Sequence, residues 1–126
     1  MKVFAIIIPI IIIVIGGWYL SFQSIVSHTD NFNRKLNELS IMVKNSNWEE
    51  AQDDFSEIKN KWKQLRNKWT IFFDNHEIDN IDLAMAKVAK YIETNNSSLA
   101  SGEIEILKEL FRIAKENEAL SLTNLL

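Results

Sequence analysis

Few residues of this 126-residue chain have the types and spacing that acid–base or metal chemistry requires. The one such constellation is His76 followed by Glu77, Asp79 and Asp82. An imidazole among carboxylates could ligate a metal ion or act as a general base. The stretch lacks the glycine and distal glutamate of an EF-hand loop and the H-E-x-x-H spacing, and nothing beside it indicates a nucleophile or substrate pocket. We therefore interpret these residues as the acidic first turn of a helix, and we expect no enzyme activity, metal site or cofactor.

The composition excludes further kinds of site and favours helices. The chain has no Cys, which removes disulfides, thiolate zinc sites, iron–sulfur clusters and cysteine nucleophiles. The formal net charge is -3 and the pI about 5.4, so we expect no nucleic-acid partner. With 3 Gly and 1 Pro, the chain has too few turn residues for a turn-rich β fold or a disordered protein. An all-α fold is the prediction.

The N-terminal segment has the length and polarity of a transmembrane helix. No formally charged residue lies between Lys2 and Asp30, and Val3–Leu20 is almost wholly apolar. Eighteen helical residues span about 27 Å, close to the hydrocarbon thickness of a bilayer. Trp18 and Tyr19 follow at the membrane interface, where aromatic side chains are enriched. We predict that residues 1–28 form a signal-anchor transmembrane helix.

Two alternatives for this segment stay open. A cleaved signal peptide would have a shorter apolar region followed by small residues in an A-x-A-like pattern, whereas this segment continues into Tyr19 and Leu20. A buried core helix is the other alternative, and it is disfavoured because the segment has no polar face. For orientation, the sequence offers Lys2 and the α-amine on one side and Arg34 and Lys35 on the other. This balance favours a cytoplasmic N-terminus with the rest of the chain outside the cell membrane.

Residues 29–126 are predicted to form an extracytoplasmic helical bundle. Apolar residues at steps of three, four and seven continue the membrane helix outward to about residue 44. Further helices are predicted over residues 48–73, from about 78 to 92, and from about 99 to 117, with Asn47 and Glu50 as a capping box for the first of these. Trp48, Trp62 and Trp69 lie on one apolar stripe, so we interpret them as core residues. Short connections favour an antiparallel, up-down-up-down arrangement.

The helix predicted over residues 48–73 is acidic early and basic late. A stalk from Leu20 to Lys44 would be about 36 Å long, so the returning helix would reach the membrane surface near its basic, aromatic end. We hypothesise that this end contacts anionic lipid or a partner; the alternative is a solvated face paired with the next helix. The residues of this predicted surface are Lys59, Lys61, Lys63, Arg66, Lys68, Trp69, Phe72 and Phe73.

Three short motifs occur along the chain beyond the apolar segment. The first is Asn47-Trp48-Glu49-Glu50-Ala51 with Trp62 and Trp69, the second is Phe73, His76, Glu77 and Ile78 with Asp79 completing a His-x-x-Asp stretch, and the third is the ending Ser121, Leu122, Asn124, Leu125. In these motifs the chain resembles a bacterial family, domain-of-unknown-function family 4363. The resemblance, which includes the hydrophobic N-terminus, implies small membrane-anchored helical proteins of spore-forming Gram-positive bacteria. It implies no activity and carries over no catalytic residue.

Together these features predict a single-pass membrane protein acting as a non-enzymatic interaction or structural module at the outer face of the bacterial membrane. The expected partners are the lipid bilayer and a membrane or envelope protein. An apolar tail, Leu120, Leu122, Leu125 and Leu126, is also compatible with self-association. The alternative is a ligand-sensing or accessory subunit of a larger membrane complex.

Overall fold

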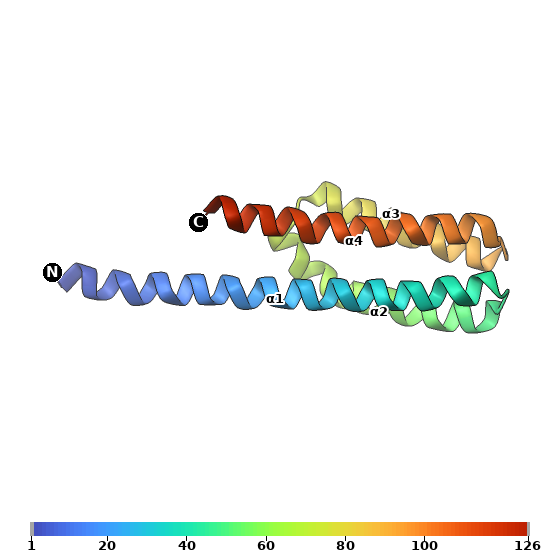
Figure 1. Ribbon diagram of the computed structural model, residues 1–126, viewed down its shortest axis with the longest axis horizontal. Helices are drawn as coiled ribbons and strands as arrows, with labels where there is room; N and C mark the ends of the chain where they lie inside the picture. The colour runs from blue at the N-terminus through green and yellow to red at the C-terminus, as the bar shows by residue number, and fades with distance from the viewer. Residues whose placement is uncertain (1, 126) are drawn as a thin grey trace.

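The chain folds into four helices that run alternately in opposite directions. The structure, a computed structural model, describes residues 2–125, and for residues 21 and 118–125 it describes the backbone alone. The helices are α1 (Lys2–Lys44), α2 (Trp48–Phe72), α3 (Asn75–Glu93) and α4 (Ser97–Leu125). Each packs against the helix before and after it in the chain, and α4 closes the bundle against α1. Figure 1 shows the chain reversing at every loop, which confirms the predicted all-α, up-down-up-down bundle.

Helix α1 belongs to the bundle over only part of its length. Its N-terminal part projects beyond the other three helices in Figure 1, and its large apolar side chains from Val3 to Ile15 are exposed. This part is long and apolar enough to cross a membrane, and none of its most apolar window is buried. The first core residue of α1 is Ile25, which is 3% exposed, and the helix passes from the exposed part to the packed part without a break. The bundle is therefore joined to the apolar segment by continuous helix.

The α1–α2 and α3–α4 loops, at the end of the bundle away from the N-terminus, have the same backbone geometry. Ser46 and Asn95 adopt positive φ angles of 57° and 56°. In each loop the amide of the following residue, Asn47 or Asn96, donates to a carbonyl five residues earlier, at 2.9 Å in both cases, and this pattern is that of a Schellman motif. The Oγ of Ser97 donates to the carbonyl of Val43 at 3.3 Å and joins the start of α4 to the end of α1. These turns reverse the chain within three residues without glycine.

The predicted capping box at Asn47 and Glu50 is wrong. Asn47 completes the Schellman motif of α1, and its backbone angles, φ -81° and ψ 67°, depart from the extended conformation of a capping residue. Its side chain makes no capping hydrogen bond. The equivalent residue of the other loop does cap its helix, since the Oδ1 of Asn96 accepts from the amide of Leu99 at 3.1 Å. This cap explains why α4 begins at Ser97, two residues before the predicted start.

The core confirms the predicted stripes of α2 and α3 and corrects that of α4. Ile78, Ile81, Met85, Val88 and Ile92 of α3 are all buried, as their spacing predicts. The apolar pattern of α4 predicts that Leu99, Ile106, Leu107, Leu110, Phe111 and Ile113 pack in the core. Leu107 and Phe111 are buried and Leu110 is partly buried, whereas Leu99, Ile106 and Ile113 are exposed. The buried face of α4 also contains Ala100, Ile104 and Ala114. Two alanines on the buried face let α4 approach its neighbours closely, which larger side chains would prevent. The apolar residues of α4 thus form two rows, of which one is buried and one, Leu99, Ile106 and Ile113, is exposed.

Aromatic rings from three helices meet in the part of the core nearer the apolar segment. Phe32 of α1 stacks on Phe111 of α4 with ring centroids 4.7 Å apart. Trp62 and Trp69 of α2 approach Phe111 edge-on at 5.7 and 5.9 Å and each other at 5.4 Å. Edge-to-face and offset-stacked rings at these distances add to the free energy gained from burial alone. The predicted core position of Trp62 and Trp69 is thereby confirmed.

Candidate functional site

The acidic stretch around His76 does not converge on one point. His76 is exposed, and Glu77 accepts a hydrogen bond from Asn117 of α4. The carboxylate of Asp82 accepts from the indole Nε1 of Trp62 and from the Nε of Arg66, both at 2.7 Å. Asp82 therefore links α3 to the buried face of α2. In the described part of the chain, these acids have structural partners on two different helices.

The basic run of α2 is divided between two sides of the helix. Arg66 faces α3, where it pairs with Asp82, and lies 3.9 Å from Asp79. Lys61 and Lys68 face α1, where both lie close enough to His28 to affect its pKa. Lys59 and Lys63 line neither of the two cavities described below. The eight residues of the predicted lipid or partner surface thus do not form one surface, because an α-helix turns consecutive side chains by about 100°.

Two aromatic members of that predicted surface are core residues. Trp69 is 2% exposed and Phe73 is 6% exposed, so neither is available to a lipid or protein partner. Phe72 is half-buried and its ring packs edge-on against Trp18, with centroids 5.9 Å apart. Trp18 and the exposed Tyr19 are the predicted membrane-interface residues, and Gln23 donates a hydrogen bond to the hydroxyl of Tyr19. The end of α2 therefore lies beside the end of the apolar segment.

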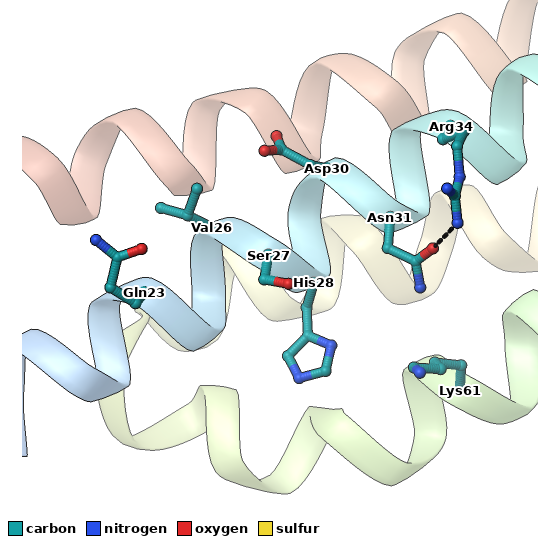
Figure 2. Close-up of a pocket in the computed structure, with 8 residues that line it drawn as sticks. All are labelled: Gln23, Val26, Ser27, His28, Asp30, Asn31, Arg34 and Lys61. Atoms are coloured by element: carbon teal, nitrogen blue, oxygen red, sulfur yellow. Dashed lines mark hydrogen bonds between the residues drawn. The ribbon is translucent and has the colours of Figure 1, made fainter.

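A polar groove runs between α1 and α2 just beyond this point. It has a volume of about 640 Å³ and is lined by Gln23, Val26, Ser27, His28, Asp30, Asn31, Arg34 and Lys61. Figure 2 shows His28 projecting from α1 toward α2, while Asp30 points away from it toward α4. The Oδ1 of Asp30 accepts from the ammonium of Lys115 on α4 at 3.2 Å. The carboxylate lining this groove is thus neutralised by another helix.

An apolar pocket of about 330 Å³ adjoins the polar groove on the side toward the apolar segment of α1, and His28 lines both. Its other lining residues are Leu20, Ser24, Ile25, Leu65, Lys68, Trp69 and Phe72. Partial burial lowers the pKa of His28, and the positive charges of Lys61 and Lys68 lower it further. Burial and the two neighbouring ammonium groups thus both favour the neutral imidazole of His28 over its charged form.

Farther from the apolar segment, the same interhelix seam is acidic. Burial of Asp54 raises the pKa of its carboxyl group, and the negative charges of Glu38 and Glu57 raise it further, against an opposing effect of Lys35. One carboxylate oxygen of Asp54 is buried and has no hydrogen-bond partner among the described residues. The seam between α1 and α2 thus changes from acidic near the α1–α2 loop to basic near the apolar segment of α1.

Sequence reasoning overlooked His28, the residue shared by the two cavities. His28 lies three residues after Ile25 and four before Phe32, both of which are core residues. That spacing places it beside the buried stripe of α1, but only the packing shows that this side faces Lys61 and Lys68. The sequence signal that could have indicated this site is the spacing of Lys61 and Lys68, which are seven residues apart and so lie on the same side of α2.

Comparison with protein families gives a match over most of the chain. The model of DUF4363, a domain of unknown function, matches residues 19–125. The match covers all of the bundle and leaves out the apolar segment before Tyr19. Comparison with curated proteins and with solved structures gives no match. The chain therefore belongs to the DUF4363 family.

Proposed function

We propose that this protein is a single-pass membrane protein whose helical bundle acts as a non-enzymatic interaction or structural module at the outer face of a bacterial membrane. The observation that carries the proposal is the exposed apolar part of α1, Val3–Leu20, which continues as unbroken helix into the bundle. Exposed apolar side chains of this number are costly in water and favourable in a bilayer. A rigid helical connection would fix the height and orientation of the bundle above the lipid.

The contact between Trp18 and Phe72 favours an anchor that stays attached. Signal-peptide cleavage after Tyr19 would separate Trp18 from the bundle and remove the ring that packs on Phe72. An uncleaved chain keeps this contact at the membrane surface. We therefore retain the signal-anchor interpretation, with the N-terminus in the cytoplasm.

A protein partner is proposed from the outer surface of α4. Leu99, Ile106 and Ile113 are exposed and follow one another at seven-residue intervals, so they lie along one side of the helix. Exposed apolar residues in such a row are typical of a helix that contacts another helix. A membrane or envelope protein, or a second copy of the chain, would meet this row. The side chains of the apolar tail, Leu120, Leu122, Leu125 and Leu126, lie outside the described residues.

Cysteine labelling in intact cells tests the location of the bundle. The natural chain has no Cys, so single variants give no background. Ser98→Cys is preferable to a change at Ser97, because Ser98 is exposed whereas Ser97 donates a hydrogen bond to Val43. We expect a membrane-impermeant maleimide to label Ser98→Cys in intact cells and Lys2→Cys only after lysis, with full-length protein in the membrane fraction.

Each departure from that pattern has a defined meaning. The reverse labelling would place the bundle in the cytoplasm and overturn the proposed orientation. A shortened chain that lacks residue 2 would show signal-peptide cleavage. Recovery of the full-length chain in the soluble fraction would overturn the membrane anchor itself.

A further inference from the structure

We propose that the space between α1 and α2 binds one anionic phospholipid. Its phosphate is held between Lys61 and Lys68 beside His28, and the part of an acyl chain nearest the headgroup lies in the apolar pocket. The inference rests on the proposed membrane anchoring of α1. It adds a ligand class and a defined site to that function.

The pocket lies where a lipid of the same membrane would reach it. Leu20, the last residue of the apolar segment, lines the apolar pocket. Phe72 lines the same pocket and packs on Trp18, so the pocket adjoins the expected headgroup level of the bilayer. A phospholipid would therefore enter without leaving its leaflet.

The order of polarity along the seam matches that of a phospholipid. Ile25, Leu65 and Trp69 line the pocket on the side of the apolar segment, whereas Arg34 and Lys61 line the adjoining polar groove. His28 lines both spaces, and Lys68 lies at the edge of the apolar pocket, within electrostatic range of His28. An anionic phospholipid has apolar chains on the membrane side and a phosphate beyond them. A soluble anion would match the groove but would leave the apolar pocket unused.

The cations of this site are available to a ligand. Lys61 and Lys68 are two helical turns apart on α2, about 10 Å along its axis, and none of the ion pairs of the described residues involves either of them. Asp30 is already paired with Lys115. A neutral His28 can donate one hydrogen bond to a phosphate oxygen. Burial is the main cause of the lowered pKa of His28, and Lys61 and Lys68 both lie close enough to the imidazole to lower it further.

Native mass spectrometry of the full-length chain can test the site with a matched pair of variants. The chain is purified in mild detergent, mixed with equal amounts of phosphatidylglycerol and phosphatidylcholine, and the lipid retained by the protein is counted. We expect one phosphatidylglycerol molecule to be retained at about a tenfold lower concentration than phosphatidylcholine. Lys61→Gln/Lys68→Gln should abolish this preference. Lys59→Gln/Lys63→Gln removes the same charge from the same helix and should keep it, because neither residue lines the site.

Three results would overturn the inference. Equal loss of preference in both double variants would show general charge attraction in place of a site. No preference in the natural chain would show that no anionic lipid is selected. Displacement of phosphatidylglycerol by an equal concentration of glycerol phosphate would show that the ligand is a soluble phosphate. Membrane anchoring is tested separately, by washing vesicles that contain the protein with alkaline carbonate. Release of the chain from the vesicles would overturn the proposed membrane anchor, whatever the result of the lipid-binding measurement.

Discussion

Phe111→Ala is expected to lower the free energy of unfolding by about 3–5 kcal/mol. Phe111 is fully buried and its ring contacts Phe32, Trp62 and Trp69. Truncation would leave a cavity where three helices meet and would remove one stacked and two edge-on ring contacts. Domains of this size are stable by about 5–15 kcal/mol, so the loss is a large share of the total. Denaturant unfolding of the full-length chain in micelles, followed by helical circular dichroism, measures it.

Ile113→Ala provides the control on the same helix. Ile113 is 38% exposed, so its truncation creates no closed cavity and should cost less than about 1 kcal/mol. Equal effects of the two substitutions would contradict the assignment of Phe111 as the centre of the core.

Asp82→Ala is expected to destabilise the bundle by about 1–3 kcal/mol. Asp82 accepts hydrogen bonds from Trp62 and Arg66 across the α2–α3 interface. Without the carboxylate, the buried indole N–H of Trp62 would lose its acceptor, whereas the half-exposed guanidinium of Arg66 could turn to water. The cost should therefore come mainly from the indole, and thermal or denaturant unfolding would measure it.

A double-mutant cycle separates this hydrogen bond from general charge effects. In a Trp62→Phe background, which has no indole N–H, the cost of Asp82→Ala should fall. Asp79→Ala serves as the matched carboxylate control, because Asp79 is 72% exposed on its side chain and lies 3.9 Å from Arg66. Equal destabilisation by Asp79→Ala and Asp82→Ala would show that the buried hydrogen bond is not the cause.

The fold could be predicted where one apolar stripe dominates a helix. In α2 and α3 most large apolar residues recur at steps of three and four, and the other faces are mainly polar, with Ile71 and Leu83 as exposed exceptions. Helix α4 differs because Ala100 and Ala114 are buried while Leu99 and Ile106 are exposed. The sizes of the side chains alone would place Leu99 and Ile106 in the core of the bundle. The face of α4 that is buried depends instead on how closely α4 packs against α1 and α3. The capping box was mispredicted for a related reason: Asn47 already serves the end of α1.

The candidate site was predicted only in part. The basic, aromatic end of α2 does lie beside Trp18, as the helix lengths indicate. Helix rotation, which depends on packing, turns Arg66 toward α3 and Lys61 and Lys68 toward α1. His28 becomes part of the site through the same packing. A sequence pattern lists these residues along one helix but does not pair them with the helix that faces them.

In the proposed arrangement, the bundle stands on the bilayer with the α2–α3 turn at the lipid surface. Nitroxide labels at Ile71→Cys and Ser98→Cys in the full-length chain, reconstituted in phosphatidylglycerol and phosphatidylcholine bilayers, test this directly. Ile71 is 78% exposed in the last turn of α2, and Ser98 lies near the far loops, about 37 Å away by the length of a 25-residue helix. We predict that the Ile71 label is more accessible to oxygen than to a water-soluble nickel chelate and that the Ser98 label shows the reverse. An equal ratio of oxygen accessibility to nickel-chelate accessibility at the two positions would contradict this arrangement of the bundle on the bilayer.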